Sequence, residues 1–168
     1  MSTVFKTHSG IMFNLQDFNI KDINIIDISH SLSNTCRYNG HCHRFYSVAE
    51  HCILGSYLIE PELALFFLLH DASEAYMGDV ITPLKKMFPL YQEKEDELLG
   101  LIFQKFIPVP YTDEIGKKIK EVDKEMLDLE LKFLFENINN ITFGLTPKSD
   151  IRDLFLKRYL FLMEKLYK

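Results

Sequence analysis

The stretch FFLLHDASEAYMGDV, residues 66–80, carries more information about this chain than any other. It begins as an apolar run and ends in a polar cluster that contains His70, Asp71, Glu74 and Asp79. Neighbouring His and Asp side chains can bind one divalent ion, the imidazole through nitrogen and the carboxylate through oxygen. An acid three residues further along a helix lies about one turn away. The stretch therefore predicts a buried helix that leads into a metal-assisted hydrolytic site.

The composition is that of an ordinary globular domain. Of the 168 residues, 47% are hydrophobic and 26% are charged, which predicts a single domain over residues 1–168. The formal charge of −5 argues against a nucleic-acid binder, because such proteins neutralise phosphates with a basic face. The N-terminus lacks a signal-peptide pattern, and the longest apolar run, residues 63–69, is too short to span a bilayer. We therefore expect a cytoplasmic protein that binds neither membranes nor nucleic-acid duplexes.

Turn residues and hydrophobic periodicity predict an all-α bundle with a small N-terminal β-hairpin. The hairpin is expected to turn at Ser9-Gly10, between short runs of β-type residues. The helix that contains residues 63–69 is apolar on every side, so it should be central and buried. A polar loop is expected over residues 33–40. The expected helices cover about 22–31, 44–59, 61–70, 91–106, 115–133 and 149–166.

The clearest periodicity places Asp123 at the buried edge of a helix. The apolar stripe has spacings of 4, 3, 4, 3 and 4 and consists of Ile115, Ile119, Val122, Met126, Leu129 and Phe133. Asp123 lies about 40° from Ile119 around this helix. A carboxylate in that place needs a metal ion or a buried cation as its partner. Asp123 is therefore a candidate metal ligand.

His41, His70, Asp71 and Asp123 together form a pattern that resembles the HD-domain metal phosphohydrolases. In that family one His, a His-Asp doublet and a distant Asp hold the ion. The run HDASEAYMGDVITPLKK, residues 70–86, is similar to a segment of the bacterial 5′-deoxynucleotidases and the small phage dATP triphosphohydrolases. The run CRYNGHCHRFYSVAEHC, residues 36–52, resembles a second block of the same group. The resemblance covers roughly residues 5–135 and implies an HD-type helical bundle.

Two histidines are candidates for the first ligand. His41 and His51 are ten residues apart, about 15 Å along a continuous helix, so both cannot bind one ion there. A hairpin that turns at Pro61 would bring His51 level with His70. The resemblance implies His41, because the family usually places this ligand about 30 residues before the doublet and 70 − 41 = 29. We therefore expect His41 as the ligand.

The resemblance also implies roles for the remaining polar residues. Glu74 would handle the proton of the attacking water, and Asp79 would contact the sugar, for example at its 3′-hydroxyl. Arg and Lys suit phosphate, the first as a bidentate clamp and the second as a point charge. The mixture of imidazole and carboxylate suits Zn²⁺, Co²⁺, Mn²⁺ or Mg²⁺. The expected substrate-binding residues are Arg37, His43, His51, Asp79 and Lys85.

The function implied by the resemblance is hydrolysis of a deoxynucleotide by a homo-oligomeric enzyme. The segment RYNGH…FYSVAEH is closer to the phage enzymes, which favours a dATP-type triphosphohydrolase that releases triphosphate. One alternative is a 5′-deoxynucleotidase acting on monophosphates. Another is a non-catalytic nucleotide sensor, which would be expected to lack Glu74 or a ligand. A third is a structural zinc module around Cys36, Cys42 and Cys52, although their spacing lacks a CxxC pair.

Overall fold

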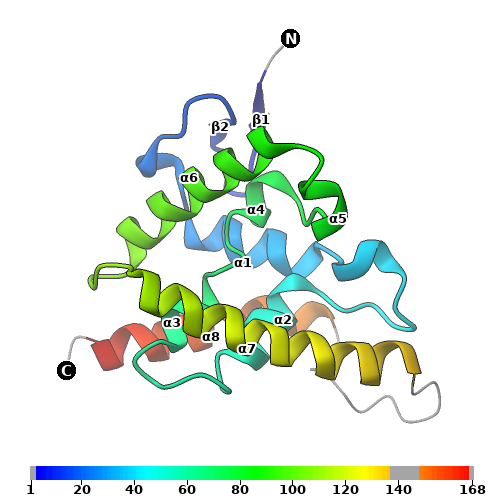
Figure 1. Ribbon diagram of the computed structural model, residues 1–168. Coiled ribbons are helices and arrows are strands. Elements are labelled where there is room, and N and C mark those ends of the chain that lie inside the picture. Colours follow the sequence, from blue (N-terminus) through cyan, green and yellow to red (C-terminus); the bar gives the residue numbers. More distant parts are fainter. Residues whose placement is uncertain (1–2, 137–147, 167–168) are drawn as a thin grey trace.

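A computed structural model describes residues 3–136 and 148–166, and over these residues the protein is a helical bundle with a two-stranded sheet at one end (Figure 1). The predicted all-α class and the N-terminal β-hairpin are both confirmed. Strands β1 (Val4–Lys6) and β2 (Met12–Asn14) pair in antiparallel register. Their connection turns at Gly10, where φ is +92°, a left-handed value that glycine adopts without strain.

The helical elements follow the hairpin along the chain. Two of them, η1 and η2, are short 3-10 turns, and η3 is a π-helical turn that continues α7. In order, the elements are η1 (Ile20–Asp22), α1 (Ile25–Asn34), η2 (Arg37–Gly40), α2 (Val48–Gly55), α3 (Ala64–Leu68), α4 (Glu74–Met77), α5 (Thr82–Lys85), α6 (Pro89–Phe106), α7 (Asp113–Leu131), η3 (Lys132–Glu136) and α8 (Lys148–Leu166).

Helix α2 is shorter than predicted. A helix was expected over residues 44–59, but α2 begins at Val48, where the Ser47 hydroxyl caps it by accepting a hydrogen bond from the Glu50 amide. Just before it, Ser47 forms an isolated antiparallel bridge with Cys36, and the Arg37 amide donates to the Tyr46 carbonyl. These extended residues tie the turn η2 to the start of α2.

Helix α3 is the buried centre of the bundle, as predicted. Its residues and Leu69 are all buried, and the chain then passes through a turn into α4. Helices α2 and α3 form a hairpin in which Gly55 allows close contact with the Phe67 ring. Helix α8 packs against α1, α2 and α3, while α7 crosses α2 on its other side (Figure 1). His70, in the turn after α3, therefore lies directly beside α2.

The stripe predicted along α7 is only partly correct. Ile119 and Met126 are buried, but Leu129 is 37% exposed and Glu130 is fully buried in its place. The buried face of the last turns is thus displaced by one residue. The cause is that this part of α7 contacts polar side chains from α2 and η2, described below, and not an apolar surface. None of the helices in the described ranges is both long and apolar enough to cross a bilayer.

Candidate active site

Four side chains converge where α2, the turn after α3 and α7 meet. The Nε2 atom of His51 lies 3.4 Å from Nε2 of His70, 3.1 Å from Oδ1 of Asp123 and 3.8 Å from Oδ2 of Asp71. His70 Nε2 lies 3.3 Å from Oδ1 of Asp71 and 3.8 Å from Oδ1 of Asp123. Tetrahedral ligands at about 2.0–2.2 Å from one ion are about 3.3–3.6 Å apart. His51, His70 and Asp71 could therefore hold a metal ion, and Asp123 lies beside them.

The hydrogen bonds behind the two histidines determine which nitrogen faces the cluster. Nδ1 of His51 lies 2.6 Å from Oε1 of Glu130, and Nδ1 of His70 lies 2.6 Å from the carbonyl oxygen of Phe67. Both partners are acceptors, so each Nδ1 donates to its partner and each Nε2 faces the cluster. The two Nε2 atoms and the two carboxylates then face one another. A proton on Nε2 bridges the ring to a carboxylate, and a ring that loses this proton offers a lone pair that suits a divalent metal.

The pKa shifts of His70 and Asp123 arise from the contacts between the histidines and the carboxylates of the cluster. Burial alone would lower the pKa of His70, but the Asp71 carboxylate and the hydrogen bond to Asp123 raise it well above its usual value. Burial would likewise raise the pKa of Asp123, yet the hydrogen bonds from His51 and His70 hold it far below its usual range. The carboxylates thus stabilise positive charge at this point of the protein.

The structure brings His51 to the cluster and leaves His41 outside it. His41 is exposed in the loop after η2, whereas His51 is fully buried on α2. The hairpin of α2 and α3 sets His51 opposite His70, as the geometry of a turn at Pro61 requires. His51 therefore takes the place predicted for His41 among the residues that could hold a metal ion. His43, expected near the phosphate, is also exposed and contacts the Phe135 carbonyl oxygen through Nε2 at 2.8 Å.

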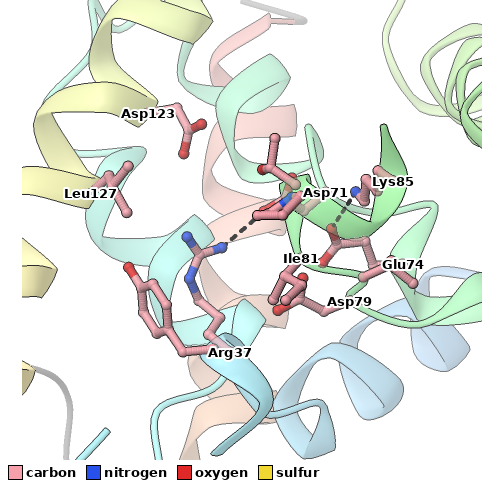
Figure 2. Close-up of a pocket in the computed structure, with 12 residues that line it drawn as sticks. Arg37, Asp71, Glu74, Asp79, Ile81, Lys85, Asp123 and Leu127 are labelled. Atoms are coloured by element: carbon pink, nitrogen blue, oxygen red, sulfur yellow. Dashed lines mark hydrogen bonds and ion pairs between the residues drawn. The ribbon is translucent and has the colours of Figure 1, made fainter. Parts of the chain in front are cut away.

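A cavity of about 330 Å³ opens beside the cluster (Figure 2). Its size lies at the lower end of the range for small-molecule sites. Of the predicted functional residues, Arg37, Glu74, Asp79 and Lys85 line it together with two of the four clustered side chains. The complete lining consists of Arg37, Tyr38, Asp71, Glu74, Asp79, Val80, Ile81, Thr82, Pro83, Lys85, Asp123 and Leu127.

Glu74 has the features of a proton acceptor. Its side chain is buried at the cavity, and Oε1 accepts a hydrogen bond from Lys85 Nζ at 3.2 Å. Its Oε2 atom has no hydrogen-bond partner within the described residues. Burial, followed by the charges of Asp71 and Asp79, raises the pKa of Glu74 well above its usual value. A buried carboxylate with a raised pKa in a cavity is a candidate for general acid–base chemistry.

Both predicted phosphate-binding cations are held by carboxylates. Lys85 Nζ lies between Glu74 and Oε1 of Glu95, at 2.8 Å from the latter, so it is not a solvated surface lysine. Arg37 Nη1 lies 3.4 Å from Oδ2 of Asp71, the contact drawn in Figure 2. Burial would lower the pKa of each cation, but the neighbouring acids raise it. Both cations therefore stay charged at the edge of the cavity.

Sequence reasoning missed Glu130. Its Oε1 accepts from His51 Nδ1 and, at 2.9 Å, from the Tyr46 hydroxyl, while Oε2 accepts from the Tyr38 hydroxyl. Burial alone would raise the pKa of Glu130, but the hydrogen bond from His51 and its charge lower it to about 2. One signal was present in the sequence, because Glu130 follows Asp123 by seven residues, two turns along the same face of a helix.

Two proteins of unassigned activity are similar to this chain. It is 30% identical over 185 aligned positions to the uncharacterized protein RCAP_rcc00048 of Rhodobacter capsulatus, a match that covers 94% of each chain. The chain belongs to the family of that protein. It is also 44% identical over 117 residues to the uncharacterized protein YfdR of Escherichia coli K12, and this match spans 66% of each chain, just under two thirds. No family model matches the chain.

Proposed function

We propose that this protein is a metal-dependent phosphohydrolase that acts on a deoxynucleotide. The observation that carries the proposal is the meeting of the Nε2 atoms of His51 and His70 with the carboxylates of Asp71 and Asp123, beside a cavity that contains Glu74. Imidazole and carboxylate ligands suit Zn²⁺, Co²⁺, Mn²⁺ or Mg²⁺. A divalent ion held there would act as a Lewis acid, polarising a phosphoryl oxygen and lowering the pKa of water.

Glu74 is the residue proposed to move the proton. Its Oε2 atom takes a proton from the water that attacks phosphorus, and the proton then passes to the oxygen of the P–O bond that breaks. Lys85 supports this role because its hydrogen bond to Oε1 fixes the orientation of the carboxylate. A buried carboxylate with a raised pKa is a stronger base than an exposed one, and this makes it better suited to the step.

Arg37 and Asp79 are proposed to bind the two polar parts of the substrate. Arg37 has five N–H donors in a planar fork, more than its ion pairs with Asp71 and Glu130 use, so it can bind a phosphoryl oxygen from the cavity wall. Asp79 lines the same cavity and can accept a hydrogen bond from a sugar hydroxyl. Together they would orient the phosphate and the sugar within the cavity that Glu74 also lines.

The charge of the cavity favours a second candidate, the 5′-deoxynucleotidase. Four acids line it, Asp71, Glu74, Asp79 and Asp123, against the two bases Arg37 and Lys85, so the formal sum is 2 − 4 = −2. A divalent cation brings this sum to zero. A monophosphate, at about −1.5 to −2, is then easier to accommodate than a more highly charged triphosphate. The sequence resemblance instead favours dATP and release of triphosphate.

One assay tests the function and separates the two products. Each dNTP and dNMP is incubated with the protein and Mn²⁺ or Co²⁺, and inorganic phosphate is resolved from triphosphate, with Glu74→Gln as the matched control. Triphosphate released from dATP supports the phage-like activity, and phosphate released from monophosphates supports the nucleotidase. Binding of deoxynucleotides without turnover would identify a sensor. Neither binding nor turnover of any deoxynucleotide would overturn the proposal.

A further inference from the structure

We infer that Glu130 is a positioning residue that fixes the metal ligand His51 and the phosphate-binding residue Arg37 as one unit. The inference rests on the metal site proposed above. Glu130 lies on α7 two turns beyond Asp123, and its side chain is fully buried. It does not line the cavity, so it would act on the site only through the residues that it holds.

The contacts of Glu130 require a carboxylate. Oε1 accepts from His51 Nδ1 at 2.6 Å and from the Tyr46 hydroxyl at 2.9 Å. Oε2 accepts from the Tyr38 hydroxyl and forms an ion pair, without a hydrogen bond, with Arg37 Nε at 3.3 Å. Three partners donate hydrogen bonds and the fourth is a cation, and an ionised carboxylate is the side-chain group that only accepts and carries a negative charge. A glutamine of the same shape would turn its own N–H donors toward some of them.

For His51, this contact determines how the ring serves as a ligand. A carboxylate at Nδ1 keeps the proton on that nitrogen, holds the plane of the ring and makes Nε2 a more basic donor to a metal. Because the His51 ring is fully buried beside Phe67, Glu130 also supplies the hydrogen bond that water cannot provide there.

For Arg37, the same carboxylate stabilises a strained turn. In η2, Tyr38 and Asn39 have φ values of 57° and 50°, and Gly40 follows at 77°. Consecutive left-handed residues other than glycine are unfavourable and persist only where surrounding contacts hold them. The Tyr38 hydroxyl and the Arg37 guanidinium both attach this turn to Glu130. These contacts act together with the hydrogen bond from the Arg37 amide to the Tyr46 carbonyl and the ion pair with Asp71 to hold Arg37 at the cavity.

The test compares two buried glutamates. Glu130→Gln removes the charge behind His51, whereas Glu50→Gln makes the same change one residue from His51, at a glutamate that pairs with Arg44. Affinity for Zn²⁺ and Co²⁺ is measured by competition with a chromogenic chelator, and the visible spectrum of bound Co²⁺ reports ligand geometry. We expect Glu130→Gln to weaken metal binding about 10–100-fold and to alter the Co²⁺ spectrum. Glu50→Gln should stay within about twofold of the parent protein on the same scale.

A folded Glu130→Gln protein with unchanged metal affinity and Co²⁺ spectrum would overturn the inference. If that variant does not fold, Glu130→Asp keeps the charge but withdraws it by one methylene, and unchanged affinity there overturns the inference equally. Failure of the proposed function has a different result. A protein that binds metal tightly through Glu130 but hydrolyses no deoxynucleotide would leave this inference intact.

Discussion

The Nε2 atoms of His51 and His70 lie 3.4 Å apart, and the Nδ1 atom of each ring lies 2.6 Å from an acceptor on the side away from the other ring. When both Nε2 atoms are unprotonated, their lone pairs repel each other at this distance unless a cation lies between them. Glu130 and the Phe67 carbonyl hold the two rings in this arrangement from behind. The fold thus holds together side chains that could bind a metal ion, and such preorganisation is the condition for a precise metal site.

The position of His51 in the cluster, with His41 outside it, leads to a direct prediction. His51→Ala should lose tight metal binding, because it removes a donor from the cluster, whereas His41→Ala should keep the metal stoichiometry of the parent protein. Asp71→Ala should lose both metal and activity, since a neutralising ligand is gone. Metal content after dialysis, measured by elemental analysis, distinguishes these outcomes. Loss of metal in the His41 variant alone would restore His41 as the first metal ligand.

Added metal should also stabilise the protein. A ligand that binds only the folded state, at 100 times its dissociation constant, raises the free energy of unfolding by about 2.7 kcal/mol. Zn²⁺ or Mn²⁺ should therefore increase the denaturation midpoint of the parent protein and leave that of Asp71→Ala almost unchanged. Urea titrations with and without metal measure this difference. An equal increase in both proteins would place the binding elsewhere on the molecule.

Glu74 should affect turnover without affecting metal binding. Glu74→Gln keeps the size and polarity of the side chain but removes its basicity. A positioned acid or base typically contributes about 10²–10⁴-fold to the rate, so kcat should fall by that order while metal occupancy persists. Lys85 offers a useful comparison, since Lys85→Met removes the hydrogen bond to Oε1 but leaves the base in place. Turnover of the Gln variant close to that of the parent protein would return Glu74 to a structural role.

The close packing of α2 on α3 predicts opposite effects for two Gly→Ala changes. A Cβ on Gly55 would lie 2.1 Å from Cε1 of Phe67, so Gly55→Ala should destabilise the protein by about 1–3 kcal/mol through overpacking. At Gly100, inside α6, a Cβ would meet no atom within 4 Å. Gly100→Ala should stabilise by about 0.5–1 kcal/mol. Denaturant unfolding measures both. Because α2 carries His51 and His70 lies in the turn directly after α3, only the Gly55 variant should also weaken metal binding.

The parts of the fold that follow from local sequence were predictable. The hairpin, the central α3 and the long helices α6 and α7 each have a turn signal or a periodicity of their own. The late start of the second predicted helix, at Val48 instead of residue 44, had no such signal. The residues before Val48 are extended because they pair with the segment at Cys36. No local pattern in residues 44–47 reports that contact.

The candidate site shows the same division between local and distant information. The doublet His70-Asp71 and the acids Glu74 and Asp79 lie within ten residues, so their proximity could be predicted. The partners of Glu130 lie 79 and 92 residues away in the sequence at His51 and Tyr38. A hydrophobic stripe could not identify its position, since the buried face of α7 shifts by one residue where its neighbours become polar.

Asp79 is predicted to bind the sugar of the substrate. A substrate analogue that lacks the 3′-hydroxyl tests this contact. Asp79→Ala removes the acceptor proposed for the 3′-hydroxyl, so kcat/KM for an ordinary deoxynucleotide should fall about 10–100-fold, the value of a hydrogen bond to a charged group. A 3′-deoxy analogue never makes this bond, so its kcat/KM should change little in the variant. Asp79→Asn keeps an acceptor oxygen without the charge and should give an intermediate loss. The measurement is kcat/KM for both substrates with all three proteins. Equal losses on the two substrates would refute the contact with the sugar and leave Asp79 as a residue that shapes the loop between Gly78 and α5.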